Sequence, residues 1–112
     1  RERVGIARAL AIQPDILLMD EPFSALDEFT REKLNDDVLS IWRKTNKTVL
    51  FVTHNISESV YMSDRICVLS PHPGRLSAIV DVNLPRPRVP DMRGTPEFAA
   101  LVEKVRNSFE GI

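Results

Sequence analysis

Short runs of apolar residues alternate in this chain with segments in which apolar residues recur at helical spacing. Two runs, ILLM at residues 16–19 and TVLFV at residues 48–52, are apolar at almost every position, which predicts strands buried on both faces. Between them the pattern predicts an amphipathic helix from about Asp27, a good N-cap, to Thr45. The apolar stripe of this helix consists of Leu34, Val38, Ile41 and Trp42.

The second half of the chain begins with a helix-start signal. Asn55, with Glu58 three residues later, resembles a capping box and predicts a short helix to about Met62. RICVLS then predicts a strand, PHPG a turn, and the alternating apolar residues of 76–84 a half-exposed strand that completes a hairpin. The next stretch, LPRPR, predicts an extended and solvated segment that needs no further function.

Helical spacing also appears at both ends of the chain. RERVGIARALAI predicts a helix that ends near Pro14, with no capping residue before it. The chain starts with Arg1 rather than Met, so we expect it to be a piece of a longer protein. At the other end, Thr95 as cap, Pro96 at the first helical position and Gly111 after the last turn delimit a C-terminal helix. The whole pattern predicts an α/β fold: a parallel sheet flanked by helices, with an edge β-hairpin and a C-terminal helix.

Three polar side chains follow the two most apolar runs. Asp20 and Glu21 come directly after the first run, and His54 follows the second. Ligands of parallel α/β sheets bind at the carboxyl ends of the strands, so we expect these side chains to converge on one edge. One carboxylate there suits Mg²⁺, the other can take a proton from an attacking water, and the histidine can hydrogen-bond a transferring phosphoryl group. The alternatives are that Asp-Glu only begins a solvated loop and that His54 is an ordinary exposed histidine.

Composition narrows the classes of function. The net charge is −1 and no basic stripe is present, so no nucleic-acid partner is expected. Apolar runs are too short for a membrane-spanning helix or a signal peptide. The one cysteine, Cys67, lies within RICVLS and is predicted to be a small buried residue, which suits a cytosolic protein.

The combination of motifs resembles the carboxyl-terminal half of an ABC transporter ATPase. RERVGIARALAIQPDILLMDEPFSALD followed by TVLFVTHNISESVYMSDRICVLS carries this resemblance, which extends over essentially all of residues 1–112. ILLMDE resembles the Walker B strand, and SALD resembles the D-loop. The resemblance implies a partial P-loop NTPase core, with ATP and Mg²⁺ as substrate and cofactor.

The same resemblance assigns roles to individual residues. It implies that Asp20 holds Mg²⁺ through water, that Glu21 is the general base, and that His54 is the switch histidine that contacts the γ-phosphate. It also places the D-loop at the interface with a second ATPase subunit. The D-loop residues are Ser24, Ala25, Leu26 and Asp27.

Several parts of a complete ATPase are absent from the sequence. The chain has four glycines and no G-x-x-x-x-G-K-[ST] loop, which cradles the β- and γ-phosphates in P-loop enzymes. The glutamine loop and the signature sequence are absent too. We therefore expect the parent protein to be an active ATPase and residues 1–112 alone to be inactive.

The tail of the chain narrows the resemblance further. VLSPHPGRLSAIVDVNLPRPR and TPEFAALVEKVR resemble ATPase subunits of nitrate, sulfonate, taurine and bicarbonate importers. This implies transmembrane permease subunits as partners, an extracytoplasmic solute-binding protein as an indirect partner, and a peripheral location on the cytoplasmic face of the membrane. Two alternatives are a non-transport ABC ATPase and a non-catalytic interaction module.

Overall fold

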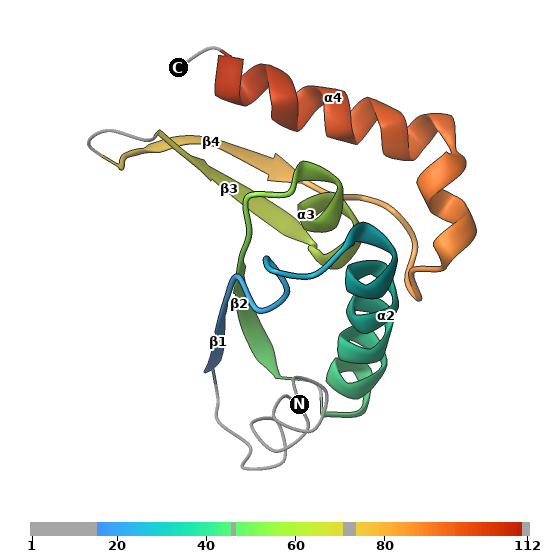
Figure 1. The fold of residues 1–112 in the computed structure, drawn as a ribbon. Helices are drawn as coiled ribbons and strands as arrows, with labels where there is room; N and C mark the ends of the chain where they lie inside the picture. The colour runs from blue at the N-terminus through green and yellow to red at the C-terminus, as the bar shows by residue number, and fades with distance from the viewer. Residues whose placement is uncertain (1–15, 46, 71–73, 111–112) are drawn as a thin grey trace. The chain divides into compact units, whose positions relative to one another are not determined.

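The computed structural model describes residues 16–45, 47–70 and 74–110, which belong to two compact units divided between His54 and Asn55 (Figure 1). The helix predicted over the first 14 residues and the centre of the PHPG turn lie outside the described residues.

The first unit contains a two-stranded parallel sheet and one long helix. Strands β1 (Ile16–Asp20) and β2 (Thr48–Val52) pair in register from Ile16 opposite Thr48 to Asp20 opposite Val52. Helix α2 (Glu28–Thr45) connects them and lies alongside the sheet (Figure 1). A parallel pair of strands requires such a crossover connection, and the strand–helix–strand order predicted from the sequence is confirmed.

The prediction that both strands are buried on both faces is wrong. Burial alternates along β1: Leu17 and Met19 lie on the more buried face, whereas Ile16 and Leu18 are exposed. Leu50 and Val52 of β2 are exposed as well. Among the described elements of this unit, only α2 covers a face of the sheet, so the second apolar face is left in contact with solvent.

Helix α2 begins as predicted but buries a different set of residues. The backbone N–H of Thr30 donates to Asp27 Oδ1 at 2.9 Å, so Asp27 is the N-cap. The buried positions are Asn35, Val38 and Leu39, whereas the other members of the predicted stripe are only half-buried. Near the helix end, Trp42 Nε1 donates to the backbone carbonyl of Lys47, just before β2.

The second unit is a hairpin covered by helices. It contains α3 (Ile56–Met62), β3 (Arg65–Leu69), β4 (Leu76–Asp81), the 3₁₀ helix η1 (Pro90–Gly94) and α4 (Pro96–Glu110). Strands β3 and β4 are antiparallel, as predicted, but they form a sheet of their own rather than an edge of the parallel sheet. The hairpin turn ends with Gly74 at φ 79°, a left-handed conformation that glycine adopts without steric cost.

Side-chain alternation in the hairpin corrects the expectation for the cysteine. Ile66 and Val68 point into the core of this unit, with 8% and 1% exposure. Cys67 lies between them on the opposite face and is exposed. The core of the unit also receives Phe98 and Val105 of α4, which packs against α3 and both strands.

The segment LPRPR also differs from the prediction of a solvated stretch. Arg88 is buried, with none of its side-chain surface accessible, and Arg86 is largely buried. Both residues donate hydrogen bonds to backbone carbonyls at the end of α3.

The α/β class predicted from the sequence is confirmed: the described residues form a small parallel sheet, a hairpin and helices. None of the helices within residues 16–45, 47–70 and 74–110 has both the length and the apolar character needed to cross a membrane.

Candidate functional site

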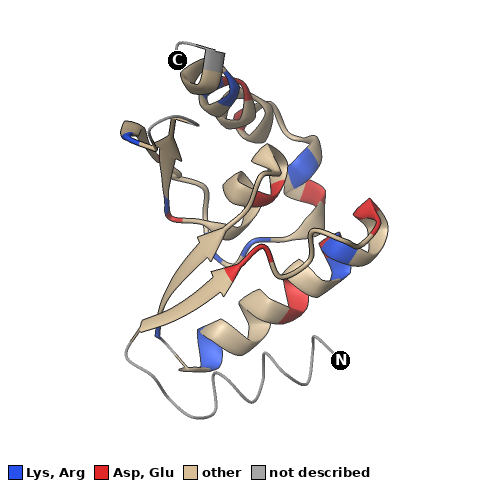
Figure 2. Ribbon diagram, turned by 60° about the vertical axis from the view of Figure 1, so that its left-hand side comes forward, with Lys and Arg blue, Asp and Glu red and all other residues tan. Residues whose placement is uncertain are grey.

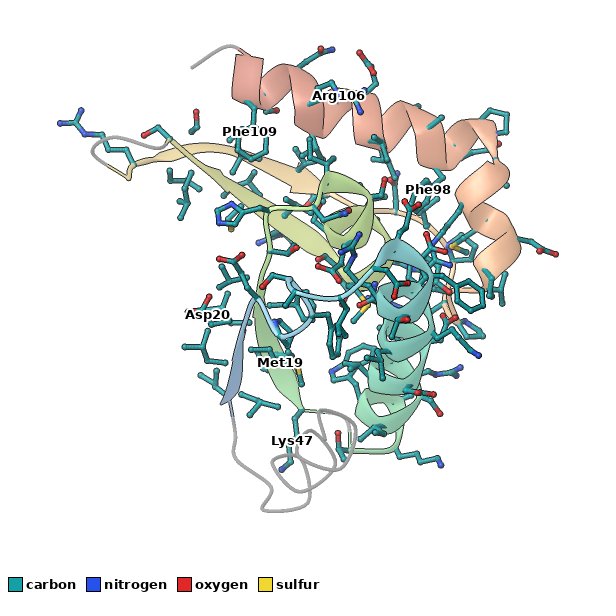
Figure 3. All side chains as sticks on the ribbon, viewed as in Figure 1. Met19, Asp20, Lys47, Phe98, Arg106 and Phe109 are labelled. Atoms are coloured by element: carbon teal, nitrogen blue, oxygen red, sulfur yellow. The ribbon has the colours of Figure 1, made fainter. Side chains whose placement is uncertain are left out.

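The candidate site lies at the carboxyl edge of the parallel sheet. Asp20 is the last residue of β1 and lies opposite Val52, the last residue of β2. Met19 is buried and the neighbouring Asp20 is exposed, because successive side chains of a strand point to opposite sides (Figure 3). Figure 2 shows acidic residues at the point where β1 ends, and the side chain of Asp20 there is exposed to solvent.

Glu21 leaves the strand in an uncommon backbone conformation. Its N–H donates to the carbonyl of Val52 at 2.8 Å, which extends the ladder one residue beyond β1. Its φ is 46°, in the left-handed region that residues with a Cβ adopt only at a steric cost. Strained backbone of this kind concentrates at functional sites, where the surrounding structure holds it in place.

This conformation brings Glu21 to His54. Nε2 of His54 lies 3.1 Å from Oε2 of Glu21, so the imidazole N–H can donate to the carboxylate. The Glu21 side chain is 33% exposed and that of His54 is 85% exposed. The predicted convergence of these two residues is confirmed, and both remain accessible to a ligand.

The loop after Glu21 is held by one buried side chain and two hydrogen bonds. Phe23 is 1% exposed, and its carbonyl accepts the N–H of Leu26 at 3.1 Å. Arg31 Nη1 donates to the carbonyl of Leu26, also at 3.1 Å. Between these fixed points, Ser24 and Ala25 are exposed. The loop thus presents two small residues to solvent from a held backbone.

Asp27 ends the loop and has a structural role of its own. Its two carboxylate oxygens accept hydrogen bonds from the backbone N–H and the hydroxyl of Thr30, each at 2.9 Å. The backbone hydrogen bond from Thr30 is the main cause that lowers the pKa of Asp27 below its usual 3.8. Whatever else Asp27 does, it anchors the start of α2.

The donor set at this edge fits Mg²⁺. Residues 16–45, 47–70 and 74–110 include no group of three or more His, Cys, Asp and Glu that could hold a metal by themselves. Magnesium ions at nucleotide sites are commonly held by one or two carboxylates, with substrate phosphates and waters completing the shell. The exposed carboxylate of Asp20 at the strand end can supply one such contact.

The polar residues of the candidate site can be recognised in the sequence, but the groups that fix their positions cannot. The residues next to Glu21 in the sequence do not predict a positive φ. Arg31 has the sequence context of an ordinary basic residue on an exposed helix surface, so its hydrogen bond to the loop is not predicted either. Phe23 carried a usable signal, because a large apolar residue among turn residues often anchors a loop.

Comparison with curated proteins identifies relatives over nearly the whole chain. The aliphatic sulfonates import ATP-binding protein SsuB of Bacillus licheniformis is 49% identical over 109 residues, which is 97% of this chain and 42% of the relative. The taurine import ATP-binding protein TauB of Rhizobium johnstonii is 48% identical over 111 residues, 95% of this chain and 42% of the relative. An ABC transporter ATP-binding protein of Methanocaldococcus jannaschii is 50% identical over 107 residues, 96% and 39% respectively.

The chain therefore spans about two fifths of the length of these relatives, and the shared part is a C-terminal portion. No protein-family model matches the chain.

Proposed function

Because this chain belongs to the ABC transporter ATP-binding proteins, we propose that its parent protein hydrolyses ATP with Glu21 as the general base. The contact between Glu21 and His54 is the observation that carries the proposal. It joins a carboxylate and an imidazole at the ligand-binding edge of a parallel sheet, and both side chains are accessible. This pair can handle a proton and a phosphoryl group at one place.

The two residues have different roles in this proposal. The carboxylate of Glu21 accepts the proton of the water that attacks the terminal phosphate of ATP. His54 donates a hydrogen bond to the phosphoryl group, where negative charge is stabilised during transfer. Nε2 of His54 faces Oε2 of Glu21 in the structure, so in this proposal the same N–H group has two alternative acceptors, the carboxylate and the phosphoryl group.

Asp20 is the proposed contact for Mg²⁺, held through water. Mg²⁺ bound there would neutralise charge on the phosphates of the nucleotide. Asp20 suits this role because its side chain is exposed and lies one residue before the base.

The loop that contains Ser24, Ala25, Leu26 and Asp27 is proposed to contact a second ATP-binding subunit. Its support is the exposure of Ser24 and Ala25 on a backbone held by Phe23 and Arg31. A loop fixed in advance loses little conformational entropy when a partner binds.

The transported solute is proposed from the relatives. The names of the similar SsuB and TauB proteins specify import of aliphatic sulfonates and of taurine. We propose that the parent protein powers an importer of a small anion such as nitrate, a sulfonate or taurine. It would work with transmembrane permease subunits and, indirectly, a solute-binding protein, at the cytoplasmic face of the membrane.

Two substitutions in the full-length protein test the assignment of Asp20 and His54. Asp20→Asn removes a charged oxygen that a hard cation prefers, so it should weaken Mg²⁺-dependent ATP binding as well as turnover. His54→Ala should leave ATP binding intact and lower turnover, because it removes a contact made chiefly to the transferring phosphate. Binding is measured by titration with and without Mg²⁺, and turnover by phosphate release. The proposal fails if both variants hydrolyse ATP at the wild-type rate.

A further inference from the structure

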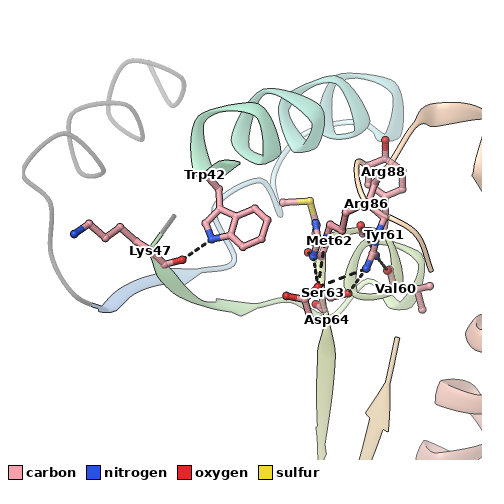
Figure 4. A network of polar contacts seen from close by, with 9 residues as sticks. All are labelled: Trp42, Lys47, Val60, Tyr61, Met62, Ser63, Asp64, Arg86 and Arg88. Carbon is pink, nitrogen blue, oxygen red and sulfur yellow. Dashed lines mark hydrogen bonds and ion pairs between the residues drawn. The ribbon is translucent and has the colours of Figure 1, made fainter. Parts of the chain in front are cut away.

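Backbone carbonyls at the carboxyl end of α3 accept hydrogen bonds from two arginines (Figure 4). Each arginine lies 24 to 28 residues later in the chain than the carbonyls that it contacts. Arg88 Nη1 donates to the carbonyls of Val60 and Tyr61 at 3.0 and 3.2 Å, and its Nη2 donates to that of Ser63 at 3.1 Å. Arg86 Nη2 donates to the carbonyl of Met62 at 3.0 Å. Every carbonyl from residue 60 to residue 63 thus accepts a hydrogen bond from a guanidinium group.

The sequence of α3 explains why these bonds matter. The last four carbonyls of any helix have no partner within the helix. Many helices end at a glycine in the left-handed conformation, but the C-cap of α3 is Ser63 in an extended conformation. The last turn of α3 contains no basic residue. At seven residues, the helix is also too short to be stable by itself.

One carboxylate offsets part of the positive charge of the two arginines at the helix end. Oδ1 of Asp64 lies 2.8 Å from Nη2 of Arg86 and 3.7 Å from Nη2 of Arg88. Burial lowers the pKa of Arg88 to about 10, so the guanidinium stays charged at neutral pH. Its positive charge lies at the negative end of the helix dipole, where cations are favoured. A fully buried arginine is thereby compensated by carbonyl groups and one carboxylate.

We propose that residues 84–88 form a latch that keeps the last turn of α3 folded, with Arg88 as its main group and Arg86 as support. When the latch is released, the carboxyl end of α3 unfolds while the β3–β4 hairpin stays paired. Asn55 caps the other end, where its Oδ1 accepts the N–H of Glu58 at 2.9 Å. Arg93, after the latch, stacks on the Tyr61 ring with 3.7 Å between the guanidinium carbon and the ring centroid. The latch is a property of the second unit and does not depend on ATP hydrolysis.

Amide hydrogen exchange of the full-length protein tests where the latch acts. Arg88→Met keeps the apolar stem and removes all three hydrogen bonds from this side chain. Exchange of residues 59–63 should accelerate by about tenfold or more, the range for hydrogen bonds from a charged group, whereas residues 66–69 and 78–81 should change by less than about twofold. Equal acceleration of helix and hairpin, or none in the helix, would overturn the proposal.

Tryptic cleavage under native conditions supplies a second, milder test. Trypsin does not cut readily between Arg86 and Pro87, so cleavage after Arg88 reports release of that buried side chain. Arg86→Gln should raise the rate of this cut about tenfold through loss of the supporting charged hydrogen bonds. The control Arg65→Gln removes an arginine that pairs with Asp81 on the exposed side of the hairpin, and should leave the rate unchanged. An unchanged rate in Arg86→Gln, or equal acceleration in both variants, would refute the latch.

Discussion

At the residue scale, Glu21 makes two contacts at once: its backbone N–H donates to the carbonyl of Val52 at the end of the sheet, and its carboxylate contacts His54. The sequence predicted which residues meet at this edge, because strand ends and polar side chains can be located from the pattern. It did not predict the φ of 46°, since neither glutamate nor the following Pro22 favours a left-handed conformation. This backbone conformation is therefore imposed by tertiary structure, in which the N–H of Glu21 bonds to Val52 and its carboxylate contacts His54.

Paired substitutions at position 21 test this strain. Glu21→Ala and Glu21→Gly both remove the carboxylate, but only glycine accepts φ 46° without a Cβ clash. The glycine variant should be more stable than the alanine variant by about 1 kcal/mol, the steric cost of one left-handed residue. Urea unfolding of the two full-length variants gives the comparison. If the alanine variant were equally stable or more stable, position 21 would not be strained.

At the element scale, local chemistry was easier to predict than distant contacts. The N-caps Asp27, Asn55 and Thr95 are confirmed, because each accepts a backbone N–H from three residues further along. Arg88 was missed for the opposite reason: its partners lie 25 to 28 residues earlier, and its neighbours predict an exposed segment. The helix starts are determined by residues close in sequence, whereas the end of α3 is stabilised by residues far away in the sequence.

The acid dependence of the α2 cap follows from the lowered pKa of Asp27. A carboxyl group whose pKa is lower in the folded state contributes stability above its unfolded pKa of 3.8 and loses it as the pH falls through the folded value. Asp27→Asn keeps an acceptor oxygen but cannot titrate. The wild type should therefore exceed this variant in stability most at about pH 7, and the difference should shrink below about pH 4. Urea midpoints across this range that differ by a constant amount would contradict the role of the charge.

At the scale of the whole molecule, the parallel sheet has one apolar face without a cover among the described elements. Four large side chains on this face are exposed: Ile16, Leu18, Leu50 and Val52. Exposed apolar patches of this kind mark surfaces that other protein segments cover. The relatives are more than twice as long as the matched segment, so they contain further chain that this segment lacks.

Dye binding measures this exposed face directly. The 112-residue chain, expressed alone, should bind a hydrophobic fluorescent dye and tend to aggregate, whereas the full-length protein should bind much less dye. Leu18→Ser and Leu50→Ser together should reduce the fluorescence of the short chain, because both leucines belong to the exposed face. A short chain that stays monomeric, melts cooperatively and binds no dye would show that the face is not available.

The most direct test of the whole account is the ATP turnover of full-length Glu21→Gln beside that of Glu28→Gln. Glutamine at position 21 keeps size and hydrogen bonding but cannot take a proton from water, so turnover should fall by about two to four orders of magnitude while ATP still binds. Glu28 is an exposed residue in the first turn of α2, and its substitution should leave turnover near the wild-type value. Wild-type turnover in Glu21→Gln would contradict the assignment of Glu21 as the general base.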